Sequence, residues 1–371
     1  MKEKNIQLMK PNVGEDELEL LREVIESGYL VQGPMVNEFE EAIKSYMGVK
    51  HAITCTSWTS GAELVFRAIE IKEGDEVICP DFSHPATALA VITAGGVPVF
   101  VDVDLDSRNT TAALFEEAIT ENTKSLQPVS IFGNPVDIDP INDIAQKNNL
   151  VVIDDAACTL GSHYKGKPVG GLTDFTIFSF HPRKVFTCGD GGLITTNDDK
   201  WSRILKSMKV FGAEDGEFKN WGTNQRMSNI HGAVLLGQAR RIDSIVQERI
   251  DRAKKYDKLL AGLDNIHIPK IDSQNRSNYQ TYAILLDFET SSLDEIRSKI
   301  MKRMREKGIQ TQIGTYSISS TPYLSKYRIV GKLENSKRLA SGLLSLPLHH
   351  ELDDKDLQYV AECLEESILS L

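Results

Sequence analysis

The sequence predicts an α/β protein with a seven-stranded, mostly parallel sheet and a smaller C-terminal α/β domain. Short apolar runs recur through the first half of the chain, and helical patterns separate several of them. Parallel strands covered by helices on both faces give this pattern. With 371 residues, 41% hydrophobic and 26% charged, the chain can bury a large core and divide into two domains. We expect a large domain at residues 1–240 and a small C-terminal domain at residues 241–371.

The expected elements follow in chain order. Leu18, Leu21 and Ile25 fall on one stripe of an opening helix at residues 15–27, and Gly28 can end it. The seven candidate strands are His51–Cys55, Glu76–Cys79, Val97–Val101, Leu126–Ile131, Leu150–Asp154, Phe175–Phe180 and Gly192–Thr196. The helical patterns between them are Ser60–Ile71, Ala86–Ala94, Ala112–Ile119 and Ile138–Asn148.

The second half of the chain is expected to begin with a bridge between the domains. We expect one long helix at residues 233–263 to form this bridge. A loop at residues 271–279 and an apolar strand at residues 282–286 come next. A further helix is expected to open with a capping box at residues 292–295 and to close at Gly308.

The overall charge excludes some classes of function. A net charge of -11 opposes electrostatic binding to nucleic acid or to an anionic membrane. Residues 1–10 are polar and no stretch approaches membrane-spanning length, so we expect a soluble cytoplasmic protein. The five cysteines are widely spaced without a CxxC pair, which indicates neither a metal site nor a disulfide framework.

Lys184 is the first candidate catalytic residue. It follows the apolar strand at residues 175–180 and precedes a segment of glycines and small polar residues. A lysine in such a place can lose hydration and act as a nucleophilic amine. The alternative is a solvated loop lysine.

Asp155 lies 29 positions upstream, at the end of a short apolar strand. The ligand crevice of an open α/β sheet lies outside the carboxyl ends of its strands, so Asp155 and Lys184 can face each other there. Pyridoxal 5'-phosphate (PLP) requires this pair, since a lysine forms an imine with its aldehyde and an aspartate keeps its ring nitrogen protonated. A structural salt bridge is the alternative.

The segment at residues 54–62 is a candidate phosphate site. Its hydroxyls and small residues lead into a helix, whose first N–H groups and dipole attract a phosphate. It has too few glycines for a P-loop and no Gly-x-Gly-x-x-Gly pattern. Simple N-capping by Ser57 or Thr59 is the alternative.

These segments together resemble the DegT/DnrJ/EryC1/StrS family of PLP-dependent sugar aminotransferases, over nearly the whole chain. Besides the strand ending at Asp155 and the Phe178–Lys184 segment, further stretches match in order and at compatible separations. They are Ser27–Leu30, Gly33–Pro34, Gly74–Ile78, Leu160–Lys167, Asn224–Met227 and Leu346–His349.

The resemblance implies a fold-type I transferase, like aspartate aminotransferase, that forms a homodimer with shared active sites. Lys184 matches the imine-forming lysine and Asp155 matches the partner of the pyridine nitrogen. Thr59, Ser60 and Ser179 match phosphate-contacting positions. Asn224 matches an asparagine that reaches the phosphate from the neighbouring subunit.

Three residues depart from the family's usual pattern. Trp58 stands where a small residue is common, so the phosphate cup is expected to have a different shape. His84 occupies the position of an aromatic residue that stacks on the cofactor ring, and imidazole offers less area and can titrate. Cys158 stands where glutamine or histidine is usual near the cofactor. We expect these residues to tune the site without abolishing its chemistry.

The resemblance implies transfer of an amino group from an amino acid, L-glutamate, to a nucleotide-linked keto sugar, with pyridoxamine 5'-phosphate formed in between. A 4-keto-6-deoxy hexose is the expected sugar, and Arg183, Lys165 and Arg226 are candidate cations for its phosphates. A sugar dehydratase of the same fold is one alternative, although it usually has histidine in place of Lys184. A non-catalytic sensory or regulatory protein that retains the fold is another.

Overall fold

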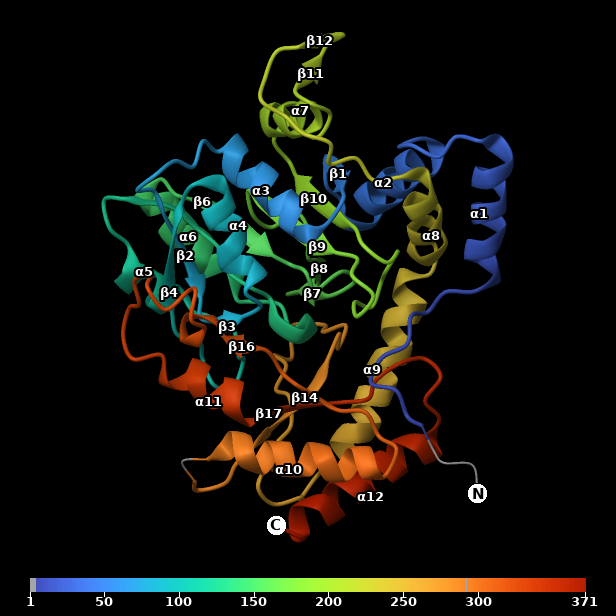
Figure 1. Ribbon diagram of the computed structural model, residues 1–371, viewed down its shortest axis with the longest axis vertical. Coiled ribbons are helices and arrows are strands. Elements are labelled where there is room, and N and C mark those ends of the chain that lie inside the picture. Colours follow the sequence, from blue (N-terminus) through green and yellow to red (C-terminus); the bar gives the residue numbers. More distant parts are fainter. Residues whose placement is uncertain (1–4, 291) are drawn as a thin grey trace.

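The computed structural model describes residues 5–290 and 292–371 (Figure 1). Its large sheet has the strand order β1-β10-β9-β6-β5-β2-β4. Neighbouring strands are parallel, except that β10 runs antiparallel to both β9 and β1. The seven-stranded, mostly parallel sheet is therefore confirmed. Its strands are β1 (His51–Cys55), β2 (Glu76–Pro80), β4 (Val97–Val101), β5 (Thr123–Leu126), β6 (Val151–Asp155), β9 (Phe175–Ser179) and β10 (Gly192–Thr196).

Helices cover both faces of this sheet because most of its strands are buried on both sides. One apolar cluster joins one face to six helices, and a second joins the opposite face to three. The first group is α1 (Glu15–Ser27), α2 (Pro34–Met47), α5 (Ala112–Ala118), α6 (Ile138–Asn148), α8 (Asn229–Ala239) and the first half of α9 (Ile242–Leu259). The second group is α3 (Trp58–Ala68), α4 (Ala86–Ala94) and α7 (Asp199–Met208).

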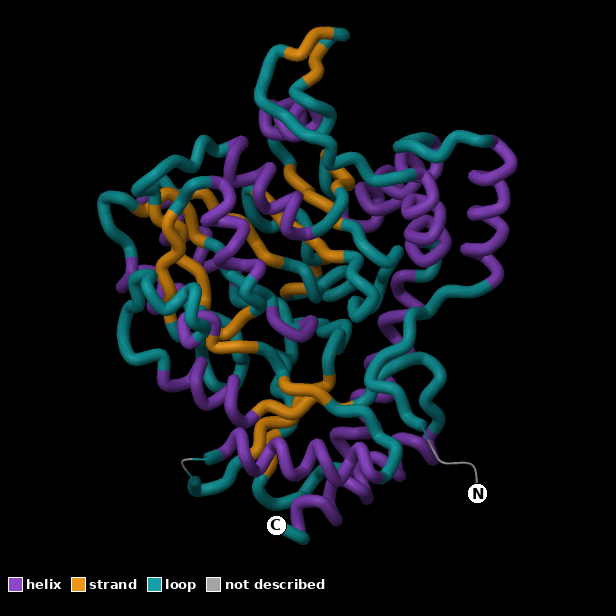
Figure 2. Tube along the Cα trace, in the orientation of Figure 1, coloured by secondary structure: helices purple, strands orange, loops and turns teal. Residues whose placement is uncertain are grey.

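A smaller antiparallel sheet lies apart from the large one, and Figure 2 shows its strands as a separate orange group. Its order is β13-β14-β17-β15, with β13 (Ile266–His267), β14 (Tyr282–Leu286), β17 (Leu343–Leu346) and β15 (Gln312–Ile313). An apolar cluster packs it against α9 (Ile242–Leu259), α10 (Leu293–Glu306) and α12 (Asp354–Leu369). Helix α11 (Glu334–Gly342) packs between the two sheets, against β14 and the short strand β3.

The remaining elements are short. Two of them, β3 (Phe82–Ser83) and β16 (Tyr316–Ser317), pair with each other and connect the two units. The hairpin of β11 (Ala213–Glu214) and β12 (Glu217–Phe218) projects from the large unit at the top of Figure 1. The others are β7 (His163–Tyr164), β8 (Lys167–Pro168) and the 3-10 turns Ile131–Gly133 and Ile318–Ser320.

Three expected elements are wrong in detail. The long helix at residues 233–263 is two helices, α8 and α9, because Arg241 leaves the helical backbone at φ -128° and its guanidinium binds Glu17 of α1 at 2.6 Å. The strand expected at residues 126–131 ends at Leu126, shortly before Pro128, which has no N–H to donate. The capping box at residues 292–295 is absent, since the Ser292 side chain makes no cap hydrogen bond.

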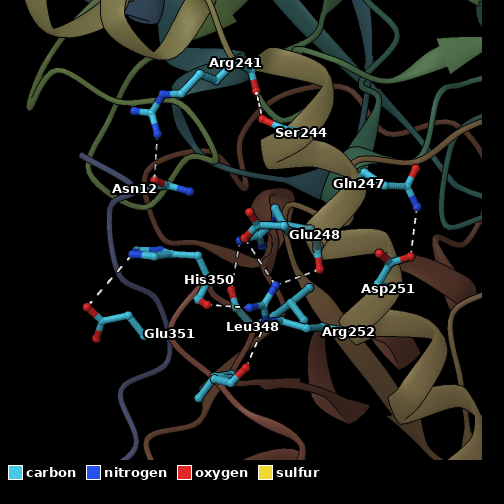
Figure 3. Close-up of polar contacts among 12 residues, drawn as sticks. Asn12, Arg241, Ser244, Gln247, Glu248, Asp251, Arg252, Leu348, His350 and Glu351 are labelled. Carbon is cyan, nitrogen blue, oxygen red and sulfur yellow. Dashed lines mark hydrogen bonds and ion pairs between the residues drawn. The ribbon is translucent and has the colours of Figure 1, made fainter. Parts of the chain in front are cut away.

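Helix α9 carries the chain from the large unit to the small one. Its Arg252 side chain donates to the carbonyl oxygen of His350, which lies in the loop before α12 (Figure 3). The N-terminal segment also lies against the small unit, where the Ile6 N–H donates to the Gly308 carbonyl at 2.8 Å. The domain boundary at residue 240 falls at the bend between α8 and α9, and it stays a prediction. Within the described residues, no helix combines the length and apolar character that crossing a membrane requires.

Candidate active site

The parallel pairing of β6 and β9 brings the expected catalytic residues to one edge of the sheet. Asp155 is the last residue of β6 and pairs with Ile177 of β9. Ser179 ends β9, and the chain then turns through Lys184, whose N–H donates to the His181 carbonyl at 2.8 Å. Because both strands end at the same edge, the carboxyl group and the amine lie in one region of the molecule.

Asp155 is 5% exposed and its two carboxylate oxygens accept one hydrogen bond each. The Thr87 hydroxyl donates to one oxygen at 3.1 Å, and the Ala157 N–H donates to the other at 3.2 Å. Burial raises the pKa of Asp155 to about 6, while these donors and the charge of Lys184 oppose the rise. The group is therefore ionised at neutral pH and still close to its titration range.

Lys184 is partly buried, and its amine contacts one side chain among the described residues. The Nζ atom lies 3.1 Å from the Sγ atom of Cys158. Cys158 stands three residues beyond Asp155, in the loop that follows β6. The thiol is thus an immediate neighbour of the Lys184 amine.

The N-terminus of α3 forms the third part of the site. Ser57 caps the helix by accepting from the Ser60 N–H at 3.1 Å, so the capping alternative is confirmed for Ser57. The Ser60 hydroxyl is also engaged, since it accepts from the Ser57 N–H at 2.9 Å and donates to the Ser57 carbonyl at 2.9 Å. Thr59 is exposed in the first turn. The first-turn N–H groups and the Thr59 hydroxyl therefore face outward at a positive helix end.

A glycine holds this helix end close to the sheet. A Cβ atom on Gly192, the first residue of β10, would lie 2.4 Å from the carbonyl oxygen of Ser57. No side chain fits there without a shift of the helix. Ser179 of β9 pairs with Gly192, so its partly exposed hydroxyl lies near the same helix end.

The Trp58 side chain turns into the core. The side chain is 6% exposed and packs in the apolar cluster beneath the sheet. It lies beside Asp155 and weakly lowers the pKa of that carboxyl, although the indole N–H makes no hydrogen bond with the described residues. The expected change in the shape of the phosphate cup stays a prediction.

The small unit closes the site opposite His84. The His84 ring is exposed and lies edge-on to the Tyr316 ring, with the centroids 6.3 Å apart. Burial and the positive charges of Lys184, His181 and Arg183 lower the pKa of His84. The side chain is therefore neutral at pH 7, and its face is available to a planar ligand.

A buried carboxyl ties this part of the site to the small unit. Asp81 is fully buried and accepts from the Ser317 hydroxyl at 2.5 Å and from the Ser319 N–H at 2.7 Å. The Thr315 hydroxyl donates to the Ser83 carbonyl at 2.9 Å. These contacts fix residues 315–319 above β3, beside His84.

The three candidate cations have different surroundings. Lys165 binds Asp139 at 2.9 Å and so is already paired. The Arg226 guanidinium donates to Asn224 at 3.1 Å, on the segment that follows the β11–β12 hairpin. Only Arg183 adjoins Lys184, and its guanidinium donates to the neutral Gln312 side chain at 2.8 Å.

Sequence reasoning missed several residues that the fold brings to the site. The Gln225 side chain accepts from the Thr56 hydroxyl at 2.6 Å, next to the helix end, whereas its neighbour Asn224 is exposed. The position of Gln225 inside a family-like stretch was the available signal. Thr87 gave no signal, since its contact with Asp155 depends on the packing of α4.

The residues present fit PLP. A partly buried amine, a buried carboxyl and an open helix N-terminus supply partners for its aldehyde, ring nitrogen and phosphate. Among the described residues, no group of three or more histidine, cysteine or acidic side chains could hold a metal ion. The amine, the carboxyl and the helix N-terminus together favour PLP chemistry.

A separate groove of about 590 Å³ lies between α9 and residues 350–355, in the region drawn in Figure 3. Its lining is charged and includes Glu248, Asp251 and Arg252. It contains none of the candidate site residues. We assign no function to it.

Comparisons with known proteins identify the family of the chain. The family described as the DegT/DnrJ/EryC1/StrS aminotransferase family matches residues 11–365. GDP-perosamine synthase of Caulobacter vibrioides is 32% identical over 369 residues, covering 98% of each chain. Two solved structures are each 26% identical to this chain and cover 99% of it. One is PseC of Helicobacter pylori, an aminotransferase involved in the biosynthesis of pseudoaminic acid. Its TM-score is 0.93, and 100% of its chain is covered. The PLP form of the putative sugar aminotransferase Spr1654 of Streptococcus pneumoniae has a TM-score of 0.91 and is covered over 99%.

Proposed function

The chain belongs to the DegT/DnrJ/EryC1/StrS aminotransferase family and is a PLP-dependent sugar aminotransferase, and from this premise we propose its substrates and the roles of its residues. The amino donor is L-glutamate. The acceptor is a nucleotide-linked 4-keto-6-deoxy hexose. The match to a GDP-perosamine synthase supports a nucleotide-linked sugar.

The observation that carries the proposal is the common location of Lys184, Asp155 and the α3 N-terminus. Each of the three lies at the carboxyl edge of the large sheet. When bound, PLP supplies an electron sink for the carbon that gains or loses the amino group. The arrangement thus matches the three parts of that cofactor.

Lys184 and Asp155 divide the proton chemistry between them. The Lys184 Nζ atom would move a proton from the substrate carbon to the cofactor in the first half-reaction and from the cofactor to the sugar carbon in the second. The Asp155 carboxylate holds a proton at the ring nitrogen and is kept in place by Thr87. Thr59, Ser60 and Ser179 bind the phosphate together with the N–H groups of the first turn of α3. His84 would stack on the cofactor ring, and Cys158 lies beside the lysine amine.

Arg183 is the cation that we assign to a substrate anion. No carboxylate of the described residues lies within salt-bridge distance of its guanidinium, and its one side-chain partner is the neutral Gln312. Lys165, by contrast, is paired with Asp139. A guanidinium beside Lys184 without a carboxylate partner among the described residues suits the carboxylate of the donor or the phosphates of the sugar nucleotide.

We further propose a homodimer in which Asn224 completes the phosphate site of the other subunit. The β11–β12 hairpin before Asn224 projects from the large unit and exposes 77% of Phe218 (Figure 1). Apolar side chains are also exposed on α1 and just after it, namely Leu18, Ile25, Tyr29, Leu30 and Val31. Exposed apolar groups on one chain favour burial against a second copy.

The shared site can be tested with two inactive variants. Lys184→Ala and Asn224→Ala are purified separately, mixed, unfolded and refolded together. If Asn224 serves the other subunit, half of the dimers carry one intact site, which restores about a quarter of wild-type activity. An absence of restoration, with dimers present by light scattering, would exclude the shared site.

The reaction is tested by colour and by product. The wild-type protein should be yellow with PLP, L-glutamate should shift the visible band, and a nucleotide-linked keto sugar should restore it. The amino sugar is identified by mass and NMR, which gives both the sugar and the carbon. Lys184→Ala should stop turnover, while Lys258→Ala, on the exposed face of α9, serves as the control. Substantial transamination by Lys184→Ala, or a donor other than L-glutamate, would contradict the respective assignment.

A further inference from the structure

Two amide side chains outside the expected site contact both of its catalytic loops. Asn278 and Gln280 lie in the segment that leads into β14, far in sequence from Cys158 and Lys184. We infer that Asn278 and Gln280 are positioning residues that set the Lys184 amine against Cys158. This inference rests on the role proposed for Lys184.

Asn278 holds the loop that follows Asp155. It is 1% exposed, and its Nδ2 donates to the carbonyl oxygens of Cys158 at 2.9 Å and Leu160 at 2.8 Å. Its backbone N–H donates to the Ser162 hydroxyl at 3.0 Å. Three hydrogen bonds within five residues fix the path of this loop, and with it the position of the Cys158 side chain.

Gln280 holds the loop that carries Lys184. Its Nε2 donates to the carbonyl oxygen of Arg183 at 3.0 Å, one peptide away from the catalytic lysine. Its backbone N–H donates to Asn278 Oδ1 at 2.8 Å. The two amide side chains are therefore linked, and the segment at residues 278–280 binds both the loop after Asp155 and the loop that carries Lys184.

The fit around Asn278 leaves little freedom. A Cβ atom on Gly133, whose φ is +93°, would lie 2.0 Å from Asn278 Oδ1. The Ser162 hydroxyl, which accepts from Asn278, donates in turn to the Gly133 carbonyl at 2.8 Å. Asn278 therefore occupies a site built for a side chain of its size.

A buried arginine of helix α9 holds the segment at residues 278–280 in place. Arg249 of α9 is 5% exposed and donates to the carbonyl oxygens of Tyr279 at 2.8 Å, Gln280 at 2.9 Å and Leu348 at 2.9 Å. Its partners are carbonyl oxygens and the Met9 sulfur, with no carboxylate among the described residues. Burial lowers the pKa of Arg249 to about 9. A buried cation is costly without such acceptors, so the arrangement ties the segment firmly to α9.

The geometry has a direct consequence for catalysis. The Lys184 Nζ atom and the Cys158 Sγ atom belong to separate loops and are 3.1 Å apart. Proton transfer depends steeply on such positions, because a displacement of 1 Å can lower a rate by about 100-fold. Loss of the Gln280 donor should therefore impair the lysine more than it impairs binding.

The test replaces Gln280 by Met, which has similar length and no donor, and by Glu, which places an acceptor opposite the Arg183 carbonyl. Gln280 is only partly buried, so these variants should fold. Both should lower kcat about tenfold and leave the KM of the donor within about twofold. The pH midpoint of the visible PLP band should move by about half a unit, as expected for one lost hydrogen bond.

Asn275→Ala is the matched control. Asn275 lies on the same loop, but its side chain accepts from the Lys165 N–H at 3.0 Å, away from both catalytic loops. It should leave kcat and the band midpoint unchanged. The inference is overturned if the Gln280 variants lower only the melting temperature, or if Asn275→Ala shifts the midpoint equally. The band needs no sugar or amino donor, so this readout is separate from a failure of the proposed substrates.

Discussion

Replacing Asp155 by Asn should stabilise the cofactor-free protein at neutral pH while it abolishes turnover. Burial raises the pKa of Asp155 from 3.8 to about 6. Between these values the folded protein binds more protons than the unfolded chain, so the free energy of unfolding falls as the pH rises. The loss of folding stability caused by the buried Asp155 charge is complete above pH 6. It vanishes below pH 4, where Asp155 is protonated in both the folded and the unfolded state.

The size of the effect follows from this shift. A rise of about two pKa units corresponds to about 3 kcal/mol at pH 7.5. Asn keeps one acceptor oxygen but places an NH₂ group opposite Thr87 or Ala157, which costs about 1 kcal/mol. About 2 kcal/mol of stabilisation remains. At about 2.1 cal/mol/K per residue, this raises the melting temperature by about 3 °C.

Melting temperatures of cofactor-free wild type and Asp155→Asn are compared at pH 4.5 and 7.5. The advantage of the variant should be present at pH 7.5 and largely lost at pH 4.5. Asp143→Asn, an exposed change on α6, should show no difference between the two values. Equal or lower stability of Asp155→Asn at pH 7.5 would refute the argument that the buried charge is costly in the absence of the cofactor.

Three further changes test the surroundings of the site. Gly192→Ala should lower the melting temperature and weaken the retention of PLP on dialysis, because the new Cβ would lie 2.4 Å from the Ser57 carbonyl oxygen. Unchanged retention would contradict the close packing at this helix end. Asp81→Ala should lower the free energy of unfolding in urea by about 1–3 kcal/mol, because the Ser317 hydroxyl loses its buried acceptor. An unchanged urea midpoint would contradict this role of Asp81. His84→Phe should leave the pH dependence of turnover unchanged above pH 6.5, since the pKa of His84 is already lowered; loss of an inflection above that pH would show that the imidazole titrates there.

The sheet could be predicted from the sequence because its strands are buried on both faces. Buried parallel strands are short apolar runs, and the helices between them have clear stripes, so most bounds agree within a few residues. The break between α8 and α9 could not be predicted in this way. Helical periodicity continues across residue 241, and the turn depends on the contact of Arg241 with Glu17 in a distant helix.

For the site, the sequence by itself determined the chemical groups. Lys184 and Asp155 each follow a buried strand, and parallel strands end at one edge, so local patterns were enough to bring them together. The tertiary structure decided what surrounds them. Trp58 turns into the core, Thr87 donates to Asp155, and the Asn278–Gln280 segment contacts the two loops that carry Cys158 and Lys184. These contacts join residues up to about 120 positions apart through side-chain packing, which no local pattern of hydrophobicity or turn residues encodes.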